Sequence, residues 1–524
     1  MNSVTAKRIL VPLAVVVVLG AVYALAAFGR TTSVGAGKQV PPPRAAPVTS
    51  VMRACPSAGM ASSTTAAVAL VAAPATAGQG QAEVSRLGGI ASTHPLHTVT
   101  SPGRLSVAPV RAVGAARPAA SAASGSQPVK TVPVQGGVVV QAGGSMARGL
   151  EVEQVATGNI PSARCESPGT DFWFVGPGQH SLAAMQLFLL NPGNQAADAN
   201  VVISTDAGPL QGGADMGIAV APHSMIVQSL APVVHQSRAI ALHVRTSVGQ
   251  VVAAVEETTH AGGGGAWLPA AQTPATHVVL PGLPAATGTR QLFVAVPGTQ
   301  DAHLKLIAVT TKGSYPPAGS TGLDIPGGSA AAIVLPSLSG IPAALKLTSD
   351  VPITASAMLS GGAQGAPGVF TAASLPVEEQ GVVAFDRAGS GLASQLVLSA
   401  PGRAVMARIT EIGITGSAGT PQVVQVRAGH SMVAQLGKGG GTIHKSAFSV
   451  MITPLAGSGP LYAGRVVTSS GTGGRVQSLL PVSSSLTIVP LPKVQNAVIT
   501  TRPEPSGGRS VSPRPGSRGR PPRG

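Results

Sequence analysis

A Gln-Leu pair followed by a Pro-Gly turn occurs three times in this chain at nearly equal intervals. The pairs step by 105 residues (186 to 291) and 104 residues (291 to 395), and the turns step by the same amounts: Gln186-Leu187 with Pro192-Gly193, Gln291-Leu292 with Pro297-Gly298, and Gln395-Leu396 with Pro401-Gly402. A period of that length corresponds to a small domain and is too long for a solenoid turn. The sequence therefore predicts a tandem array of similar modules.

The composition requires that much of the chain folds. Of the 524 residues, 44% are hydrophobic and only 10% are charged, whereas disordered chains are poor in hydrophobic residues and rich in charge. Aromatic residues make up only 2%, and most of the apolar content is Ala and Val. Because Ala buries little area, we expect each module to have a small core.

Short β-rich runs separated by Gly, Pro, Asn or Asp dominate from Asp171 onward. They recur about every ten residues, a spacing typical of antiparallel sandwiches, and helical periodicity is hard to find outside the N-terminal segment. Along 303–310, Leu304, Leu306 and Ala308 alternate with His303, Lys305 and Ile307, which predicts one inward face and one mixed face. The predicted fold is all-β, with tandem immunoglobulin-like β-sandwich modules after a single N-terminal transmembrane helix.

An apolar run from Ile9 to Phe28 follows Lys7 and Arg8. Its 20 residues would span roughly 30 Å as a helix, the thickness of a bilayer core. The length favours an uncleaved single-span anchor, and Ala24-Leu25-Ala26 keeps a cleaved signal peptide as the alternative. Lys7 and Arg8 place the short N-terminal side in the cytoplasm, so the bulk lies outside the membrane, or is secreted if cleavage occurs.

These features predict a linear organisation, which we expect to form a rod. The predicted segments are a cytoplasmic N-terminus (1–8), the transmembrane helix or signal anchor (9–28), a Pro-rich linker (29–50), a degenerate first β module with a low-complexity stretch (51–165), three β-sandwich modules (166–276, 277–380 and 381–495) and a disordered Arg/Pro-rich tail (496–524).

Cys55 and Cys165 are the only cysteines. An exported chain meets an oxidising environment, so an even count favours one disulfide. Two unpaired buried thiols are the alternative. Metal binding does not fit two cysteines 110 residues apart without a His cluster.

The segments 165–176 and 187–193, with Cys55-Pro56, resemble a group of actinobacterial membrane-anchored envelope proteins. That group is catalogued only as carrying a domain of unknown function. The specific motifs are confined to these segments, although the likeness in architecture covers roughly 50–495. The resemblance implies a membrane-anchored extracytoplasmic protein and no reaction.

The net charge of +16 is concentrated near the ends. From Arg502 onward six Arg accompany one acid, Glu504. Such tails attract anionic lipid, wall polymer or nucleic acid, and a solvated solubilising tail is the alternative. Without interleaved aromatic residues we expect no nucleic-acid binding.

We find no catalytic, cofactor-binding or metal-binding residues in the sequence. Ser431 lacks the last Gly of a nucleophile elbow and sits at a repeated turn, as do His223 and His430. We interpret the Glu256-Glu257 and Glu378-Glu379 pairs as solvated edge charges, and Trp173 and Trp267 as packing residues.

The predicted protein is a non-enzymatic, membrane-anchored structural or scaffold protein of the cell envelope. The alternative is an accessory or sensor protein that binds a cell-wall polysaccharide or a partner protein. Envelope proteins and anionic wall polymer are the expected partners, and the oligomeric state is left open.

Overall fold

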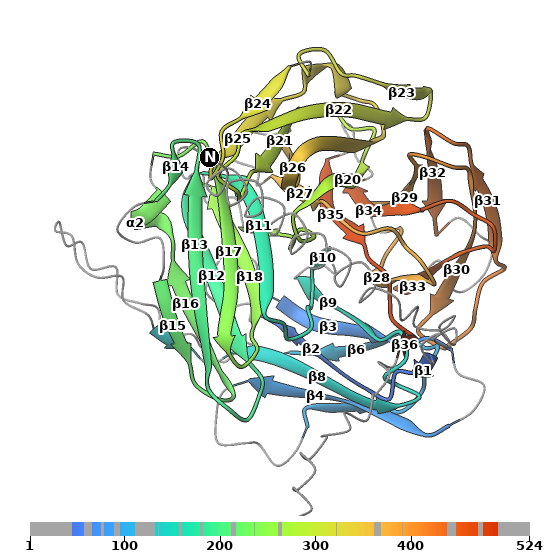
Figure 1. Ribbon diagram of the computed structural model, residues 1–524. Coiled ribbons are helices and arrows are strands. Elements are labelled where there is room, and N and C mark those ends of the chain that lie inside the picture. The colour runs from blue at the N-terminus through green and yellow to red at the C-terminus, as the bar shows by residue number, and fades with distance from the viewer. Residues whose placement is uncertain are drawn as a thin grey trace, which may run out of the picture. The chain divides into compact units, whose positions relative to one another are not determined.

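The computed structural model describes residues 45–56, 65–74, 78–87, 95–110, 132–134, 136–156, 160–178, 182–210, 216–234, 236–259, 265–320, 322–360, 368–389, 391–437, 447–469 and 475–490 (Figure 1). The chain divides into two units, of which one is Pro47–Val489 and the other comprises both ends, Met1–Ala46 and Pro490–Gly524. The sandwiches and interfaces below all lie in Pro47–Val489.

The described residues of this unit form four antiparallel β-sandwiches, each with its own apolar core. They follow one another along the chain and are coloured blue to teal, green, yellow, and orange to red in Figure 1. The strands of the first sandwich form two sheets, in the orders β2 (Ser50–Cys55), β8 (Gly137–Gly144), β4 (Gly80–Leu87), β5 (His97–Val99), and β10 (Ile160–Arg164), β9 (Glu151–Ala156), β3 (Thr65–Val71), β6 (Ser106–Pro109).

The second sandwich has two five-stranded sheets. These are β11 (Asp171–Pro177), β17 (Ala239–Val248), β13 (Ala197–Thr205) with β14 (Gly208–Pro209) and β15 (Met216–Val220), and β19 (Gly265–Leu268), β18 (Val252–Thr259), β12 (Leu182–Asn191), β16 (Ser224–Ser229), β7 (Val132–Val134). The last of these strands, β7, comes from the chain before the second sandwich and extends its sheet.

In the third sandwich one long strand, β26 (Ala343–Ser360), belongs to both layers. Its first part pairs with β20 (Ala275–Leu283) and β22 (Ala302–Thr310), which carries β23 (Gly313–Tyr315) and β24 (Leu323–Ile325); its second part pairs with β21 (Thr289–Ala295), flanked by β25 (Ala330–Val334), and with β27 (Val369–Ala372).

The fourth sandwich pairs two four-stranded sheets. They are β28 (Gly381–Asp386), β33 (Phe448–Pro454), β30 (Val405–Gly413), β31 (Gln422–Val426), and β32 (His430–Leu436), β29 (Leu392–Ala400), β34 (Tyr462–Ser469), β35 (Val476–Val482). The remaining short elements are α2 (Ala231–Val234), the 3-10 turn η2 (Pro336–Leu338), β1 (Ala45–Pro47) and β36 (Ile488–Pro490).

All four sandwiches share one strand order. We call the sheet that contains the first strand of the common order (β2, β11, β20 or β28) the leading sheet of its sandwich, and the other layer the trailing sheet. In the second sandwich the leading sheet runs β11-β17-β13 and the trailing sheet runs β19-β18-β12-β16. The corresponding strands of the other sandwiches pair in the same way. The all-β prediction is therefore confirmed, and the first sandwich has the common order.

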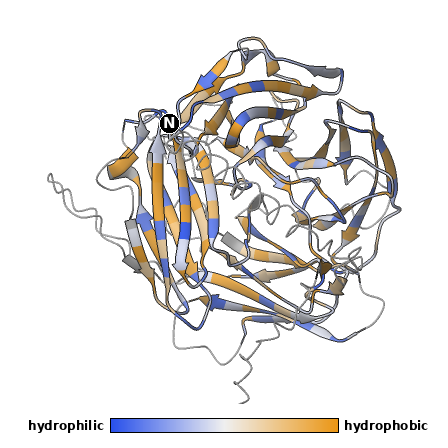
Figure 2. Cartoon of the chain, viewed as in Figure 1, coloured by the Kyte–Doolittle hydropathy of each residue, from blue (hydrophilic) through white to orange (hydrophobic). Residues whose placement is uncertain are grey.

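The repeated Gln-Leu motif lies in the central strand of the trailing sheet. Leu187, Leu292 and Leu396 point into the cores and are fully buried. Leu304, Leu306 and Ala308 also face inward, as predicted. Figure 2 shows the resulting bands of hydrophobic and hydrophilic residues along the strands.

The residue after each repeated Leu points out of its sandwich and packs on the preceding one. Phe188 packs with Ala54 and Leu87 of the first sandwich, and Phe293 packs with Val175 and Ala241 of the second. Val397 also points out of its sandwich and packs with Leu359 of the third, and Tyr462 beside it packs on Val279, Val309 and Ala344 of the leading sheet of the third. The motif thus marks both a core position and an interface position.

The first sandwich packs on the fourth by the same arrangement. Ala69 of its trailing sheet lies with Val155 and Leu105 against Phe385 of the leading sheet of the fourth. Arg104 Nε also donates to the carbonyl of Ile414 over 2.6 Å. The contacts between sandwiches therefore form a closed cycle, so the expectation of a rod is wrong. An open rod would leave the outward faces of Ala69 and Phe385 in water, and their burial favours closure.

Several predicted segments lie outside the described residues. These include the apolar run 9–28, the linker up to residue 44 and the tail from 491 onward; of the low-complexity stretch, strands β4 to β7 are described. Among the described residues no helix is long and apolar enough to cross a membrane.

A disulfide joins Cys55 to Cys165 inside the core of the first sandwich, as predicted. Both cysteines are fully buried. Cys55 ends β2 in the leading sheet, and Cys165 directly follows β10 in the trailing sheet. The bond therefore ties together the two layers, and the two ends, of the first sandwich.

We expect reduction of this disulfide to lower the free energy of unfolding by about 4–5 kcal/mol, because it closes a loop across a separation of 110 residues. Urea denaturation with and without reductant measures the loss. The Cys55→Ala/Cys165→Ala variant is the control, since its stability should not respond to reductant. Equal stability of the oxidised and reduced protein would contradict the expectation.

Candidate functional site

Six charged residues gather where the first sandwich meets the fourth. They come from β2, β9, β10, β28 and β34 and balance in number, three Arg against three acids: Arg53, Glu151, Glu153, Arg164, Asp386 and Arg465. We call this set the charged junction. Strand β9 supplies two of the acids because alternate residues of a strand share a face, here the face turned toward the fourth sandwich.

Glu151 organises one half of the charged junction. Its carboxylate accepts hydrogen bonds from Arg53 Nη2 and from Arg164 Nε and Nη2, each over 2.9 Å, and from the Ser485 hydroxyl over 3.0 Å. The Glu151 side chain is only 2% exposed. Four donors around one carboxylate satisfy its acceptor capacity within the protein.

Glu153 and Arg465 form the other half. Arg465 Nη2 donates to Glu153 Oε1 over 2.8 Å and to the Ser478 hydroxyl over 3.0 Å, and Arg465 Nη1 donates to the carbonyl of Phe385 over 2.9 Å. The Phe385 amide donates to Glu153 Oε2 over 3.2 Å. The Arg465 and Glu153 side chains are 1% and 5% exposed, so this ion pair is shielded from water.

Burial changes the acidity of two carboxyls here. Desolvation raises the pKa of Glu153 to about 7, although Arg465 opposes the shift. Desolvation also raises the pKa of Asp386 to about 6, against the opposing charge of Arg465 and the hydrogen bond from Ser394. The charged junction thus contains two acids that titrate near neutral pH.

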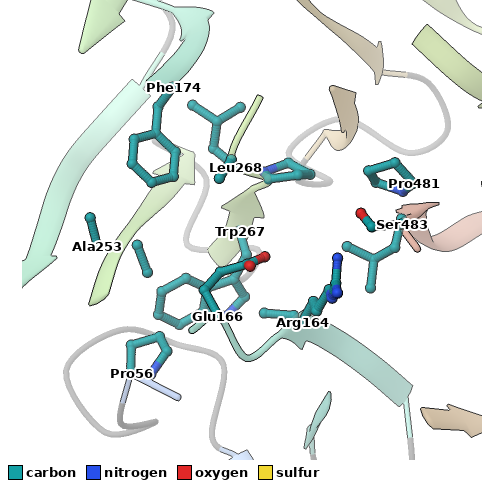
Figure 3. Close-up of a pocket in the computed structure, with 14 residues that line it drawn as sticks. Pro56, Arg164, Glu166, Phe174, Ala253, Trp267, Leu268, Pro481 and Ser483 are labelled. Carbon is teal, nitrogen blue, oxygen red and sulfur yellow. The ribbon is translucent and has the colours of Figure 1, made fainter. Parts of the chain in front are cut away.

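Two small cavities border the charged junction. One of about 30 Å³ lies between β9 and the fourth sandwich beside Arg164 and Arg465. The other, of about 50 Å³, is shared by the first, second and fourth sandwiches and is lined by Trp267, Phe174, Pro481 and others. Figure 3 shows the Arg164 and Glu166 side chains extending into this second cavity.

The geometry suits the locking of sandwiches together better than catalysis. Ligand pockets usually enclose 300–1,000 Å³, whereas these cavities of about 50 and 30 Å³ have room for only a few waters. Raised carboxyl pKa values also arise in buried structural ion pairs. The carboxylates of Glu151 and Glu153 are already occupied by protein donors.

A family model described as a family of unknown function, DUF5719, matches residues 119–437. The chain belongs to this family. The match includes Glu151, Glu153 and Cys165, and it includes all three Pro-Gly turns. The resemblance to proteins catalogued only by a domain of unknown function is confirmed. No curated protein matches the chain.

Of the residues of this DUF5719 chain predicted to lie at the repeated turn, His223 does, whereas His430 and Ser431 lie in strand β32, so that prediction is wrong for them. Ser431 is buried and its hydroxyl bonds to the Ser399 hydroxyl and the carbonyl of Val309 in the third sandwich, over 2.7 and 2.6 Å. It is a packing residue at an interface. His430 begins β32, so Gly429, not His430, occupies the turn position of His223.

The two Glu pairs have opposite environments. Glu378 and Glu379 are exposed, as predicted, but Glu256 and Glu257 are each only 3% exposed, so their assignment as solvated charges is wrong. Both lie on β18, which is paired with β12 along one edge and with β19 along the other. Glu257 Oε1 has no hydrogen-bond partner among the described residues, and burial raises the pKa of Glu257 well above its ordinary value.

Trp173 and Trp267 are packing residues, as predicted. Trp173 stacks on His243 at 3.7 Å between ring centroids, and Trp267 packs against Phe188 at 5.2 Å. Within the described residues no three His, Cys, Asp or Glu side chains are grouped so that they could hold a metal ion.

We expect Glu257→Gln to stabilise the protein increasingly as pH rises. The raised pKa of buried Glu257 means that the folded state holds this proton more tightly than the unfolded state, so the contribution is present below about pH 4.5 and is lost as pH rises toward the folded pKa. Urea denaturation at several pH values from about 4.5 upward measures the difference between variant and wild type. Exposed Glu378→Gln is the matched control, and a difference independent of pH would contradict the expectation.

We expect Arg465→Met to lower the free energy of unfolding by about 3–5 kcal/mol, because it leaves the buried Glu153 carboxyl without its cation. The double variant Glu153→Met/Arg465→Met should recover most of this loss, since an apolar pair removes both desolvation costs. Exposed Arg403→Met serves as the control, with an expected change within about 0.5 kcal/mol. If Arg465→Met resembled Arg403→Met in urea denaturation, the pair would not hold the sandwiches together.

Proposed function

We propose that this chain is a non-enzymatic, membrane-anchored, extracytoplasmic scaffold of the cell envelope. The observation that carries the proposal is that the hydrogen bonds of the charged junction join the first sandwich to the fourth. Across the closing interface, Glu153 accepts hydrogen bonds from Arg465 and from the Phe385 amide, and Glu151 accepts one from Ser485, which is what a rigid structural body requires.

The position of the protein in the proposal rests on the apolar run Ile9–Phe28 and the positive residues before it. A single N-terminal transmembrane helix at this run would leave all four sandwiches outside the cytoplasm. The buried Cys55–Cys165 disulfide supports an oxidising compartment. We further propose that each sandwich is immunoglobulin-like, with seven or more strands in two antiparallel layers.

The ends of the chain supply the adhesive part of the proposal. The Arg-rich stretch after Arg502 would attract anionic wall polymer, while the exposed loops and sheet edges of the sandwiches would contact envelope proteins. Nucleic acid is not among the proposed partners.

We expect the full chain to stay in the membrane pellet after carbonate washing and to be degraded by protease added outside intact spheroplasts. A variant whose Ile9–Phe28 run is replaced by a cleavable signal peptide should move to the soluble exported fraction. Immunoblotting of the fractions measures both. Release of the wild-type chain by carbonate, or protection of its sandwiches from external protease, would contradict the proposed anchoring or orientation.

A membrane-impermeant cross-linker then tests the scaffold role itself. We expect the anchored chain to be linked to envelope proteins or wall polymer, with the same products for the wild type and the Glu153→Met/Arg465→Met variant. Equal products are expected because the charged junction is proposed to hold the fold and to perform no reaction. If cells with this variant showed the phenotype of cells that lack the protein, while its fold and cross-links stayed intact, an active role for these two residues would be favoured instead.

A further inference from the structure

A hollow of about 490 Å³ lies between the first and second sandwiches and adjoins the charged junction at Ser167, to which Arg53 donates a hydrogen bond. Its lining is uncharged: Met52, Ser167, Pro168, Asn191, Pro192, Gly193, Asn194, Gln195, Gly249 and Gln250. We call it the amide groove. Its volume falls within the range of ordinary ligand sites, unlike the two cavities beside the charged junction.

The amide groove has an apolar floor and a polar rim. Pro192 is buried and Met52 and Pro168 are half-buried, whereas Asn194, Gln195 and Gln250 are exposed. The carboxamides of Gln195 and Gln250 make no hydrogen bond to any other described residue. Each offers two N–H donors and one carbonyl acceptor.

Two rim groups are held in place from behind. The His223 Nε2–H donates to Asn194 Oδ1 over 2.8 Å, which leaves the Asn194 amide N–H groups for a ligand. Arg53 Nη1 donates to the Ser167 hydroxyl oxygen over 2.8 Å, so the Ser167 proton is free to donate. The turn itself is fixed by Asn191, whose amide donates to the carbonyls of Gln195 and Val220 over 2.7 and 2.9 Å.

The internal repeat shows that the fold does not require His223 at this turn. His223 has φ of 51° and is the one non-glycine residue with positive φ among those described. At the corresponding place the third and fourth sandwiches have Gly328 and Gly429, with φ of 72° and 71°. A left-handed backbone favours glycine, so His223 carries a conformational cost that its two counterparts avoid.

Neighbouring positions depart from the repeat in the same direction. Buried Asn191 corresponds to Val296 and Ala400 in the step of 105 and 104 residues, and Asn194 corresponds to Thr299 and Arg403. The second sandwich alone of these three therefore combines Asn191, Asn194 and His223 around its Pro-Gly turn. Strain and polarity that the fold can do without are typical of functional sites.

We infer that the amide groove binds a neutral saccharide. Carboxamides and a hydroxyl, which both donate and accept, match the paired donor and acceptor character of sugar hydroxyls, and the Pro and Met floor suits the C–H face of a sugar ring. A charged ligand would find no counter-charge in the lining. An extended peptide is less favoured because the lining comes mainly from turns, and within it only Met52 belongs to an edge strand, β2, that could offer a main-chain ladder.

The inference rests on the proposed function in one respect: if the protein lies outside the cytoplasm, the natural ligand would be an envelope polysaccharide. Binding by purified protein is independent of where the protein resides. A failure of the anchoring experiment and a failure of saccharide binding are therefore distinguishable.

The test is saturation-transfer NMR and calorimetry on the full chain in detergent micelles. The probes are neutral gluco-, galacto-, manno-, arabino- and N-acetylglucosamine oligosaccharides, with an uncharged Gly/Ser/Ala peptide as the competing class. We expect at least one oligosaccharide to bind, and Gln195→Ala to weaken that binding by about tenfold through loss of a hydrogen-bonding amide. Gln300→Ala removes the residue at the same position of the third sandwich and should leave binding unchanged.

His223→Gly separates binding from folding. Glycine suits the left-handed backbone, so the stability of this variant should equal or exceed that of the wild type. Binding should nevertheless weaken, by about fivefold, because Asn194 loses the group that orients it. Absence of binding to every oligosaccharide, equal losses in Gln195→Ala and Gln300→Ala, or binding of the peptide alone would each overturn the inference.

Discussion

The packing of each trailing sheet on the leading sheet of the preceding sandwich is the interaction on which the rest of the structure depends. Phe188, Phe293 and Val397 occupy the same outward position of successive repeats and are buried at successive interfaces. A sheet covered on both faces needs apolar residues on both, which explains the unbroken apolar runs that follow each repeated Gln. Because Ala69 and Phe385 complete the series, the first and fourth sandwiches also cover each other.

Small residues make this close layering possible in a chain with few aromatics. Gly282 approaches Gly464 so closely that a Cβ at Gly282 would lie 2.9 Å from the Gly464 Cα. The abundance of Gly and Ala, which weakens each separate core, thus allows neighbouring sandwiches to approach at backbone distance. Stability that a single Ala-rich core lacks is gained by sharing apolar surface between sandwiches.

The closing interface differs from the other three because it carries the Glu153–Arg465 pair. A buried ion pair adds little net stability, but a wrong partner leaves a bare buried charge and is strongly disfavoured. The other three interfaces join sandwiches that are consecutive along the chain, whereas Glu153 and Arg465 come from the first and the last sandwich and are 312 residues apart. We interpret the charged junction as the feature that selects the correct closure among otherwise similar sheet faces.

The sequence was sufficient to predict what local pattern and the repeat determine. These are the β strands, the inward Leu304 and Leu306, the Cys55–Cys165 bond and the packing roles of Trp173 and Trp267. The closure could not be predicted, because alternation along Glu151-Val152-Glu153 shows a polar face without showing what covers it. Glu256 and Glu257 were misread for the same reason, since their burial depends on strands that pair with β18 from elsewhere in the chain.

The repeat nevertheless holds functional information that neither composition nor motif searches extract. Residues shared by the repeats, such as Leu187 and its counterparts, report what the sandwich needs in order to fold. Residues on which one repeat differs at a conformational cost report a demand from outside the fold, because selection for stability alone would replace them. His223, where Gly328 and Gly429 stand in the later repeats, is such a residue, and its ring holds the Asn194 amide at the rim of the amide groove. In a protein built from similar modules, the place where one module departs from the others is therefore where its specific chemistry is to be sought.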